Sequence, residues 1–102
     1  MSAYVVWETW LKEGAEREGL MLTQHIWRDM RSYSGYQGHL LLQDQDRPGH
    51  LIVIGQWTTR EQADRIRDDY AQSSTVQQLQ PLLARERTRS IHNAFEGNGV
   101  LI

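Results

Sequence analysis

Four short stretches of the chain are predicted to be β-strands, in which successive side chains point to opposite faces. In the first three stretches both alternating faces are largely apolar, so neither face of these strands is simply exposed to water. The sequence QDRPG separates the second stretch from the third and predicts the turn of a hairpin. The predicted strands cover residues 3–11, 36–44, 50–57 and 85–95.

Apolar residues spaced three and four positions apart predict helices between these strands. A long helix is expected over residues 13–33, with an apolar stripe on one side and charged residues on the other. The sequence TTRE has the form of a capping box, so a second helix is expected to begin at Thr58 and to end near residue 72. A short helix capped by Ser74 follows, and Pro81 either interrupts it or opens a further turn.

The order of these elements is β-α-β-β-α-(α)-β, which predicts an α+β fold of the ferredoxin-like split βαβ type with one antiparallel four-stranded sheet. Helices can cover one face of such a sheet, whereas three of the strands are apolar on both faces. A second copy of the chain is the expected cover for the other face, because homodimers are the commonest oligomers. The sequence therefore predicts a homodimer.

Length and composition are those of one globular domain. The chain has 102 residues, of which 39% are hydrophobic and 24% are charged, as in average globular proteins. We assign residues 1–95 to the domain and 96–102 to a C-terminal tail. The net charge of −2 argues against a nucleic-acid partner. No signal-peptide pattern occurs and no apolar run approaches the roughly 20 residues that span a membrane, so no membrane partner and a cytoplasmic location are expected.

Several kinds of chemistry are excluded by missing motifs. The chain has no cysteine, so it has no thiolate nucleophile and no thiolate metal site. Phosphate-binding loops, HExxH and GxSxG are also missing from the sequence. The four histidines, His25, His39, His50 and His92, include no pair three or four apart, and no metal is expected. His39 interrupts an apolar strand face and is a candidate base, whereas His50 begins a strand after a turn and is expected to be exposed.

Tryptophan and arginine supply the other candidate binding residues. Four tryptophans and four tyrosines accompany a single phenylalanine, and such side chains suit interfaces and ligand pockets. Trp57, at the junction of a strand and a helix, either anchors that helix to the sheet or forms the wall of a pocket. Arg85, Arg87 and Arg89 in the last strand either meet an anionic substrate or are surface charges of an edge strand.

The order of elements, the segment SGYQGHLLLQD and above all the segment LIVIGQWTTREQAD resemble the antibiotic biosynthesis monooxygenase family, over about residues 3–95. The resemblance implies a homodimeric α/β barrel in which two sheets face each other. Family members include cofactor-free oxygenases of polycyclic phenols and quinones, haem-degrading enzymes and isomerases. Trp57 matches the tryptophan of the oxygenases, but Val53 and Ala63 stand where the best-studied type has asparagine and tyrosine. The segment TVQQLQ has glutamine near the place of the axial histidine of the haem-degrading branch.

The resemblance implies an oxidoreductase, namely a monooxygenase that needs no cofactor and acts on an aromatic, quinone-like small molecule. Such a substrate supplies its own electrons to O₂ once it is deprotonated, so the protein need only bind it, exclude water and stabilise a phenolate. A cofactor-free isomerase or cyclase, and a binding or assembly module without chemistry, are the alternatives. The candidate residues are Trp57, Trp27 and Tyr70 as pocket walls, His39 as base, and Arg28 or Asn93 as the group that stabilises the anion.

Overall fold

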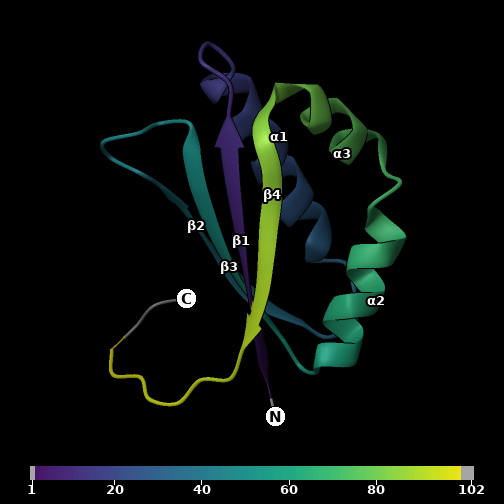
Figure 1. Ribbon diagram of the computed structural model, residues 1–102. Helices are drawn as coiled ribbons and strands as arrows, with labels where there is room; N and C mark the ends of the chain where they lie inside the picture. Colours follow the sequence, from purple (N-terminus) through teal and green to yellow (C-terminus); the bar gives the residue numbers. More distant parts are fainter. Residues whose placement is uncertain (1, 100–102) are drawn as a thin grey trace.

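The computed structural model describes residues 2–99, and it contains every element that the sequence predicts, with ends that differ by a few residues (Figure 1). The α+β class and the ferredoxin-like order are therefore confirmed. The elements are β1 (Ala3–Leu11), α1 (Glu16–Met30), β2 (Tyr36–Gln43), β3 (His50–Trp57), α2 (Arg60–Tyr70), α3 (Ser74–Leu79), a 3-10 turn η1 (Gln80–Leu82) and β4 (Leu83–His92).

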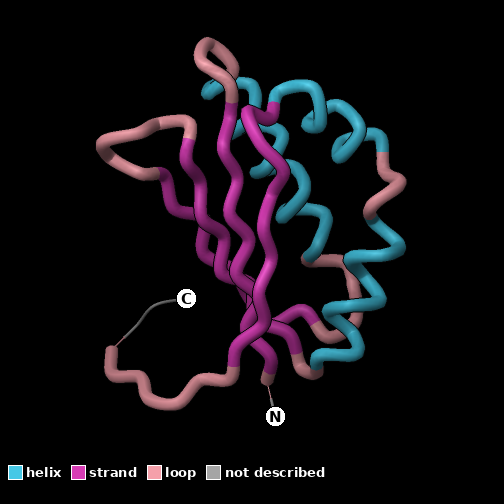
Figure 2. Tube along the Cα trace, in the orientation of Figure 1, coloured by secondary structure: helices cyan, strands magenta, loops and turns pink. Residues whose placement is uncertain are grey.

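The four strands form one antiparallel sheet in the order β2-β3-β1-β4. Both long helices and α3 lie on the same side of this sheet (Figure 2). Strand β4 is an edge strand, and it pairs with β1 so that Val5 lies opposite Ile91 and Trp7 lies opposite Arg89. This register decides which side chains of β4 face the helices.

The hydrophobic core lies between the sheet and the helices. Val5 from β1 and Leu51 and Val53 from β3 are almost completely buried, and Leu79 from α3 closes the core from the helical side. The alternation of buried and partly exposed residues along β3 is strict, as expected for a strand whose two faces have different neighbours.

The N-cap of α2 is Thr59, and the prediction of Thr58 is wrong by one residue. Thr59 has extended backbone angles of φ −143° and ψ 158°, and its hydroxyl accepts a hydrogen bond from the Gln62 amide. These angles are the ones that a capping residue requires. The Thr58 hydroxyl instead donates to the side chain of Gln62.

Helix α3 is likewise capped one residue away from the predicted position. The Ser73 hydroxyl accepts from the Val76 amide at 3.2 Å, whereas Ser74 is the first residue of the helix. Pro81 lies in the first turn of η1, where its missing N–H group costs no hydrogen bond. Of the two alternatives for this proline, the further turn is correct.

The sheet face away from the helices carries a row of apolar side chains from three neighbouring strands. Ile54 lies opposite Val6 on one side and Leu40 on the other, and Ile52 lies opposite Leu42. Within residues 2–99, no helix covers these side chains (Figure 2). We call this set of five residues the open apolar face.

Residues 93–99 follow β4 without regular secondary structure. The tail predicted for residues 96–102 thus lies partly outside the described residues. No helix in the described part of the chain is long and apolar enough to cross a membrane.

Candidate functional site

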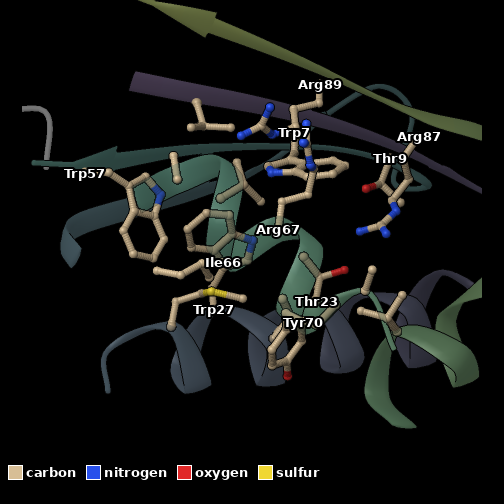
Figure 3. A pocket seen from close by; sticks show the side chains of 17 residues that line it. Trp7, Thr9, Thr23, Trp27, Trp57, Ile66, Arg67, Tyr70, Arg87 and Arg89 are labelled. Atoms are coloured by element: carbon tan, nitrogen blue, oxygen red, sulfur yellow. The ribbon is translucent and has the colours of Figure 1, made fainter. Parts of the chain in front are cut away.

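A cavity lies between the helix-facing side of the sheet and the helices (Figure 3). The space between its walls is about 680 Å³ when the open mouth is counted. Its lining comes from β1, β3, β4 and all three α-helices. The aromatic members of the lining are Trp7, Trp27, Trp57 and Tyr70.

Trp27 and Trp57 form one wall of the cavity. Their ring centroids are 6.5 Å apart with the planes inclined at 50°, and both side chains are buried. Gly55 makes this arrangement possible, because a Cβ atom at that position would lie 2.5 Å from the outer edge of the Trp27 ring. Trp57 therefore belongs to the core and also lines the cavity, so the two structural roles considered for it coexist.

Tyr70 contributes its ring to the cavity and directs its hydroxyl elsewhere. The hydroxyl donates to Asp29 on α1 at 2.6 Å, and Figure 3 shows it pointing away from the cavity. Burial, followed by the bond to Asp29, raises the pKa of Tyr70 to about 12. The Tyr70 hydroxyl is therefore a structural donor that links α2 to α1.

Three arginines line the cavity at the side of β4 and α2. Arg87 and Arg89 come from β4, and their guanidinium carbons lie 4.8 Å and 5.8 Å from the centre of the Trp7 ring. Arg67 comes from α2 and is 40% exposed at the mouth of the cavity. Arg85 points to the opposite face, where its guanidinium carbon lies 3.9 Å from the Trp10 ring centre.

The acidic partner of this group is Asp64 on α2. Arg89 Nη2 donates to Asp64 Oδ1 at 2.8 Å, and Arg67 Nη1 is 4.0 Å from the same oxygen. The hydrogen bond from Arg89 is the main reason why the pKa of Asp64 is lowered. Asp64 Oδ2 is also 3.5 Å from Arg60 Nε, so this carboxylate is shared among three arginines, and Arg67 has a second partner in Asp68, 3.0 Å from its Nε.

Two arginines of the cavity are incompletely paired. Arg89 Nε is buried and has no hydrogen-bond partner in the described chain. Arg87 has no carboxylate within 4.0 Å among residues 2–99. Burial lowers the pKa of the Arg87 guanidinium, as expected for a charge that is removed from water without a partner.

His39 lies beside the cavity rather than in its lining. Its ring is 5.4 Å from the Trp27 ring, and its Nδ1 is 2.6 Å from the Tyr36 hydroxyl. Burial, followed by the charge of Arg31, lowers the pKa of His39, so its imidazole is neutral at physiological pH.

Arg28 and Asn93 lie away from the cavity. Arg28 is exposed on α1, and Asn93 is exposed just beyond the end of β4. The structure thus brings together the predicted walls Trp27, Trp57 and Tyr70 at one cavity. The catalytic roles given to His39, Arg28 and Asn93 stay predictions.

Three lining residues, Trp7, Arg87 and Arg89, have no definite role in the sequence-based prediction. Trp7 carried no assignment, and Arg87 and Arg89 remained open between ligand binding and surface charge. The available signal is the period of two in β4, which puts Arg87 and Arg89 on the same face as Ile91, a residue packed against the core.

His50 is largely covered on the other face of the sheet, so the prediction that it is exposed is wrong. Its side chain is 13% exposed and stacks on Trp10, with ring centroids 5.4 Å apart. Its Nε2 is 2.8 Å from Glu8 and its Nδ1 is 3.0 Å from Asp44. The turn before β3 folds Asp44 back over the strand, which the sequence pattern does not show.

Comparison with known proteins identifies the fold. No protein-family model and no curated protein matches the chain. The solved structure of an antibiotic biosynthesis monooxygenase is 20% identical, covers 92% of this chain and 99% of its own, and has a TM-score of 0.81. SnoaB, a cofactor-independent oxygenase from Streptomyces nogalater, is 18% identical over 94% of each chain, with a TM-score of 0.78. A conserved protein from Methanosarcina mazei Go1 is 16% identical over 90% of this chain and 91% of its own, with a TM-score of 0.79.

The chain therefore has the fold of antibiotic biosynthesis monooxygenases, which confirms the fold that the resemblance implied for a single chain. The pairing of two chains into a barrel stays a prediction. Sequence identities of 16–20% show a shared fold but not a shared activity, because one fold serves many reactions. The residues that line the cavity therefore carry the evidence for the function.

Proposed function

We propose that the protein is an enzyme that binds a flat aromatic, quinone-like molecule in the cavity and oxygenates it with O₂ without a resident cofactor. The observation that supports this proposal is the composition of the cavity, whose walls are aromatic and whose charged lining residues are arginines. An apolar cavity with a few convergent polar groups is typical of small-molecule sites. The similar fold of SnoaB, a cofactor-independent oxygenase, favours this class of reaction.

The aromatic walls suit a planar ligand. Trp27 and Trp57 are inclined to each other, so a flat ring can stack on one indole and meet the edge of the other. The ring of Tyr70 adds apolar surface from α2. We assign substrate binding to these three residues.

The arginines suit the charge that develops during the reaction. A quinol that loses a proton becomes a phenolate, which gives electrons to O₂. One oxygen atom is then inserted at a ring C–H bond, the quinol is oxidised to a hydroxyquinone, and the second oxygen atom leaves as water. Cationic groups in a site from which water is excluded stabilise the phenolate and lower the pKa of the phenol. We assign this role to the arginines of the cavity lining, Arg67, Arg87 and Arg89.

The proton of the phenol leaves through the open mouth of the cavity in this proposal. Neither a histidine nor a carboxylate occurs among the lining residues. Tyr70, which lines the cavity, already donates its hydroxyl proton to Asp29. His39 contacts Trp27 and is proposed to hold that ring in place.

The functional unit is proposed to be a homodimer. The open apolar face groups Val6, Leu40, Leu42, Ile52 and Ile54 on one side of the sheet. Leu42 is 41% exposed in the single chain. A second copy packed against this face would remove these side chains from water.

The test is oxygen uptake by the purified protein with a panel of naphthoquinols and anthraquinols. With ¹⁸O₂, one labelled oxygen atom is expected in the product and one in water. Trp27→Leu is expected to lower the rate, whereas Met21→Ala, at an exposed position of α1, serves as the control. No uptake above the spontaneous rate with any member of the panel would contradict the proposal.

A cofactor-free isomerase or cyclase is the second candidate, because the same arginines would stabilise an enolate. Turnover of a keto substrate under nitrogen would support it. Binding of the aromatic panel without turnover in air or under nitrogen would indicate a binding module.

A further inference from the structure

We infer that the cavity contains a carboxylate subsite, formed by Arg87 and Arg89 beside Trp7, and that its physiological ligand is an aromatic carboxylate. This inference rests on the cavity of the proposed function and adds the chemical class of the molecule that it takes. Its basis is the excess of arginines over carboxylates in the cavity lining, and it holds whether or not the ligand is oxygenated.

Arg89 has one guanidinium nitrogen bonded to the protein and one without a hydrogen-bond partner among the described residues. Its Nη2 donates to Asp64 on α2 at 2.8 Å, whereas its Nε is buried and has no hydrogen-bond partner among the described residues. A buried guanidinium N–H without an acceptor is destabilising, because its hydrogen bond to water is lost on folding and no other hydrogen bond replaces it. Such a donor at the lining of a cavity indicates that the ligand supplies the acceptor.

Arg87 is a second donor of the same kind. It lies on the same face of β4, also over Trp7, and it has no acidic partner within 4.0 Å in the part of the chain that the structure describes. Figure 3 shows it beside Thr9, whose side chain is buried. An unpaired cation removed from water is unfavourable unless an anion joins it.

A carboxylate group on the ligand matches the donors of these two arginines. It has two oxygen atoms in one plane, and guanidinium groups bind carboxylates through pairs of parallel N–H donors. One oxygen can accept from the guanidinium of Arg87 while the other accepts from the guanidinium of Arg89, since both residues line the cavity. The aromatic part of the ligand then extends from Trp7 towards Trp27 and Trp57, which line the same cavity.

Asp64 is expected to oppose the ligand. Its carboxylate already holds Arg89, and it lies close to where the second anion would bind. Replacing Asp64 by asparagine removes this negative charge and releases Arg89 from its ion pair. Asp64→Asn is therefore expected to strengthen the binding of an aromatic carboxylate, a gain that a purely structural role of Asp64 does not predict.

The experiment is isothermal titration of the full chain with naphthalene-2-carboxylate and with naphthalene-2-carboxamide, which have nearly the same shape and differ in charge. The carboxylate is expected to bind about tenfold more tightly, the equivalent of one charged contact. Arg87→Gln and Arg89→Gln should each reduce this preference, and Asp64→Asn should increase it. Arg85→Gln is the matched control, because Arg85 lies on the same strand and points to the other face.

Equal affinities of the two probes would overturn the inference, as would failure of both to bind. A preference that survives in both Arg87→Gln and Arg89→Gln would also overturn it. The comparison of the two probes on the unaltered protein needs no variant, so a variant that fails to fold does not remove the test. Oxygenation of neutral quinols by a protein with no carboxylate preference would refute the subsite alone. A clear preference without any oxygenation would refute the proposed function alone.

Discussion

The imidazole of His50 is held by Glu8 across two neighbouring strands, with 2.8 Å between His50 Nε2 and a carboxylate oxygen of Glu8. Its other nitrogen, Nδ1, is 3.0 Å from Asp44. Ionised carboxylates only accept hydrogen bonds, so both ring nitrogens have to donate and the ring has to carry a positive charge. His50 is thus an imidazolium on the sheet face opposite the cavity.

This cluster predicts that the stability of the protein falls as the pH rises. The bonds to Asp44 and Glu8 raise the pKa of His50 above its ordinary value of about 6.5. The contribution of His50 is therefore fully present below about pH 6.5 and is lost as the pH rises through the raised pKa. Urea unfolding of the wild type and of His50→Gln, at equal protein concentration across this range, should give free energies of unfolding that differ at low pH and converge at high pH.

Glu8→Gln is the companion variant. It replaces one of the two carboxylates by a neutral amide, which raises the pKa of His50 less, so the loss of stability should begin at a lower pH than in the wild type. If the free energies of unfolding of the wild type and His50→Gln differ by the same amount at every pH, the imidazolium contributes nothing to stability.

Gly55→Ala is expected to disturb the cavity through Trp27. The new Cβ would lie 2.5 Å from Trp27 Cη2 and 2.6 Å from Cζ3, and this ring is buried and has little room to move. Overpacking of this kind costs about 1–3 kcal/mol of unfolding free energy. The variant should be less stable, should bind the aromatic panel more weakly and should have altered tryptophan fluorescence.

Gly97→Ala is the matched control for this substitution. A Cβ at position 97 has no heavy atom within 4 Å, so stability and binding should match those of the wild type. If Gly55→Ala binds the aromatic panel as tightly as Gly97→Ala, Trp27 is no part of the binding wall.

Tyr70→Phe separates the ring of Tyr70 from its hydroxyl. The hydroxyl donates to Asp29 outside the cavity, and Asp29 is 43% exposed and can be rehydrated. The loss of this bond should therefore lower the free energy of unfolding by about 1 kcal/mol. Because the ring remains in the wall, affinity for the aromatic panel should be unchanged in a titration of the variant.

A catalytic role of the hydroxyl would give the opposite pattern. In that case Tyr70→Phe would lose turnover while its denaturation curve stayed close to that of the wild type. Tyr70→Ala removes the ring as well and should lower both stability and affinity.

The periodic part of the fold could be predicted from the sequence, because period two and period 3.6 are local properties of the chain. The cap of α2 shows where local information is ambiguous. Thr58 with Glu61 and Thr59 with Gln62 both satisfy the capping-box pattern. The backbone turn that joins β3 to α2 selects Thr59.

The site could be predicted in part. Trp27, Trp57 and Tyr70 are large and sit on apolar stripes, so their placement next to a cavity follows from periodicity. The role of Arg87 and Arg89 depends on which face of an edge strand the helices cover. Which face the helices cover is a property of the tertiary structure. The alternation of side chains in β4 alone does not tell which of the two faces that is.

Ile54→Asp is expected to break the proposed homodimer and leave the single chain folded. Ile54 lies at the middle of the open apolar face between Val6 and Leu40, away from the core and the cavity. A carboxylate there would be buried against apolar side chains of a second copy, which is unfavourable, whereas in a single chain it would face water. Light scattering during size-exclusion chromatography should give twice 11.9 kDa for the wild type and 11.9 kDa for the variant, with the same circular dichroism. Met21→Asp, at an exposed position of α1 that is 59% accessible, should stay dimeric. A wild type that elutes at the mass of one chain would mean that the open apolar face has another partner or none.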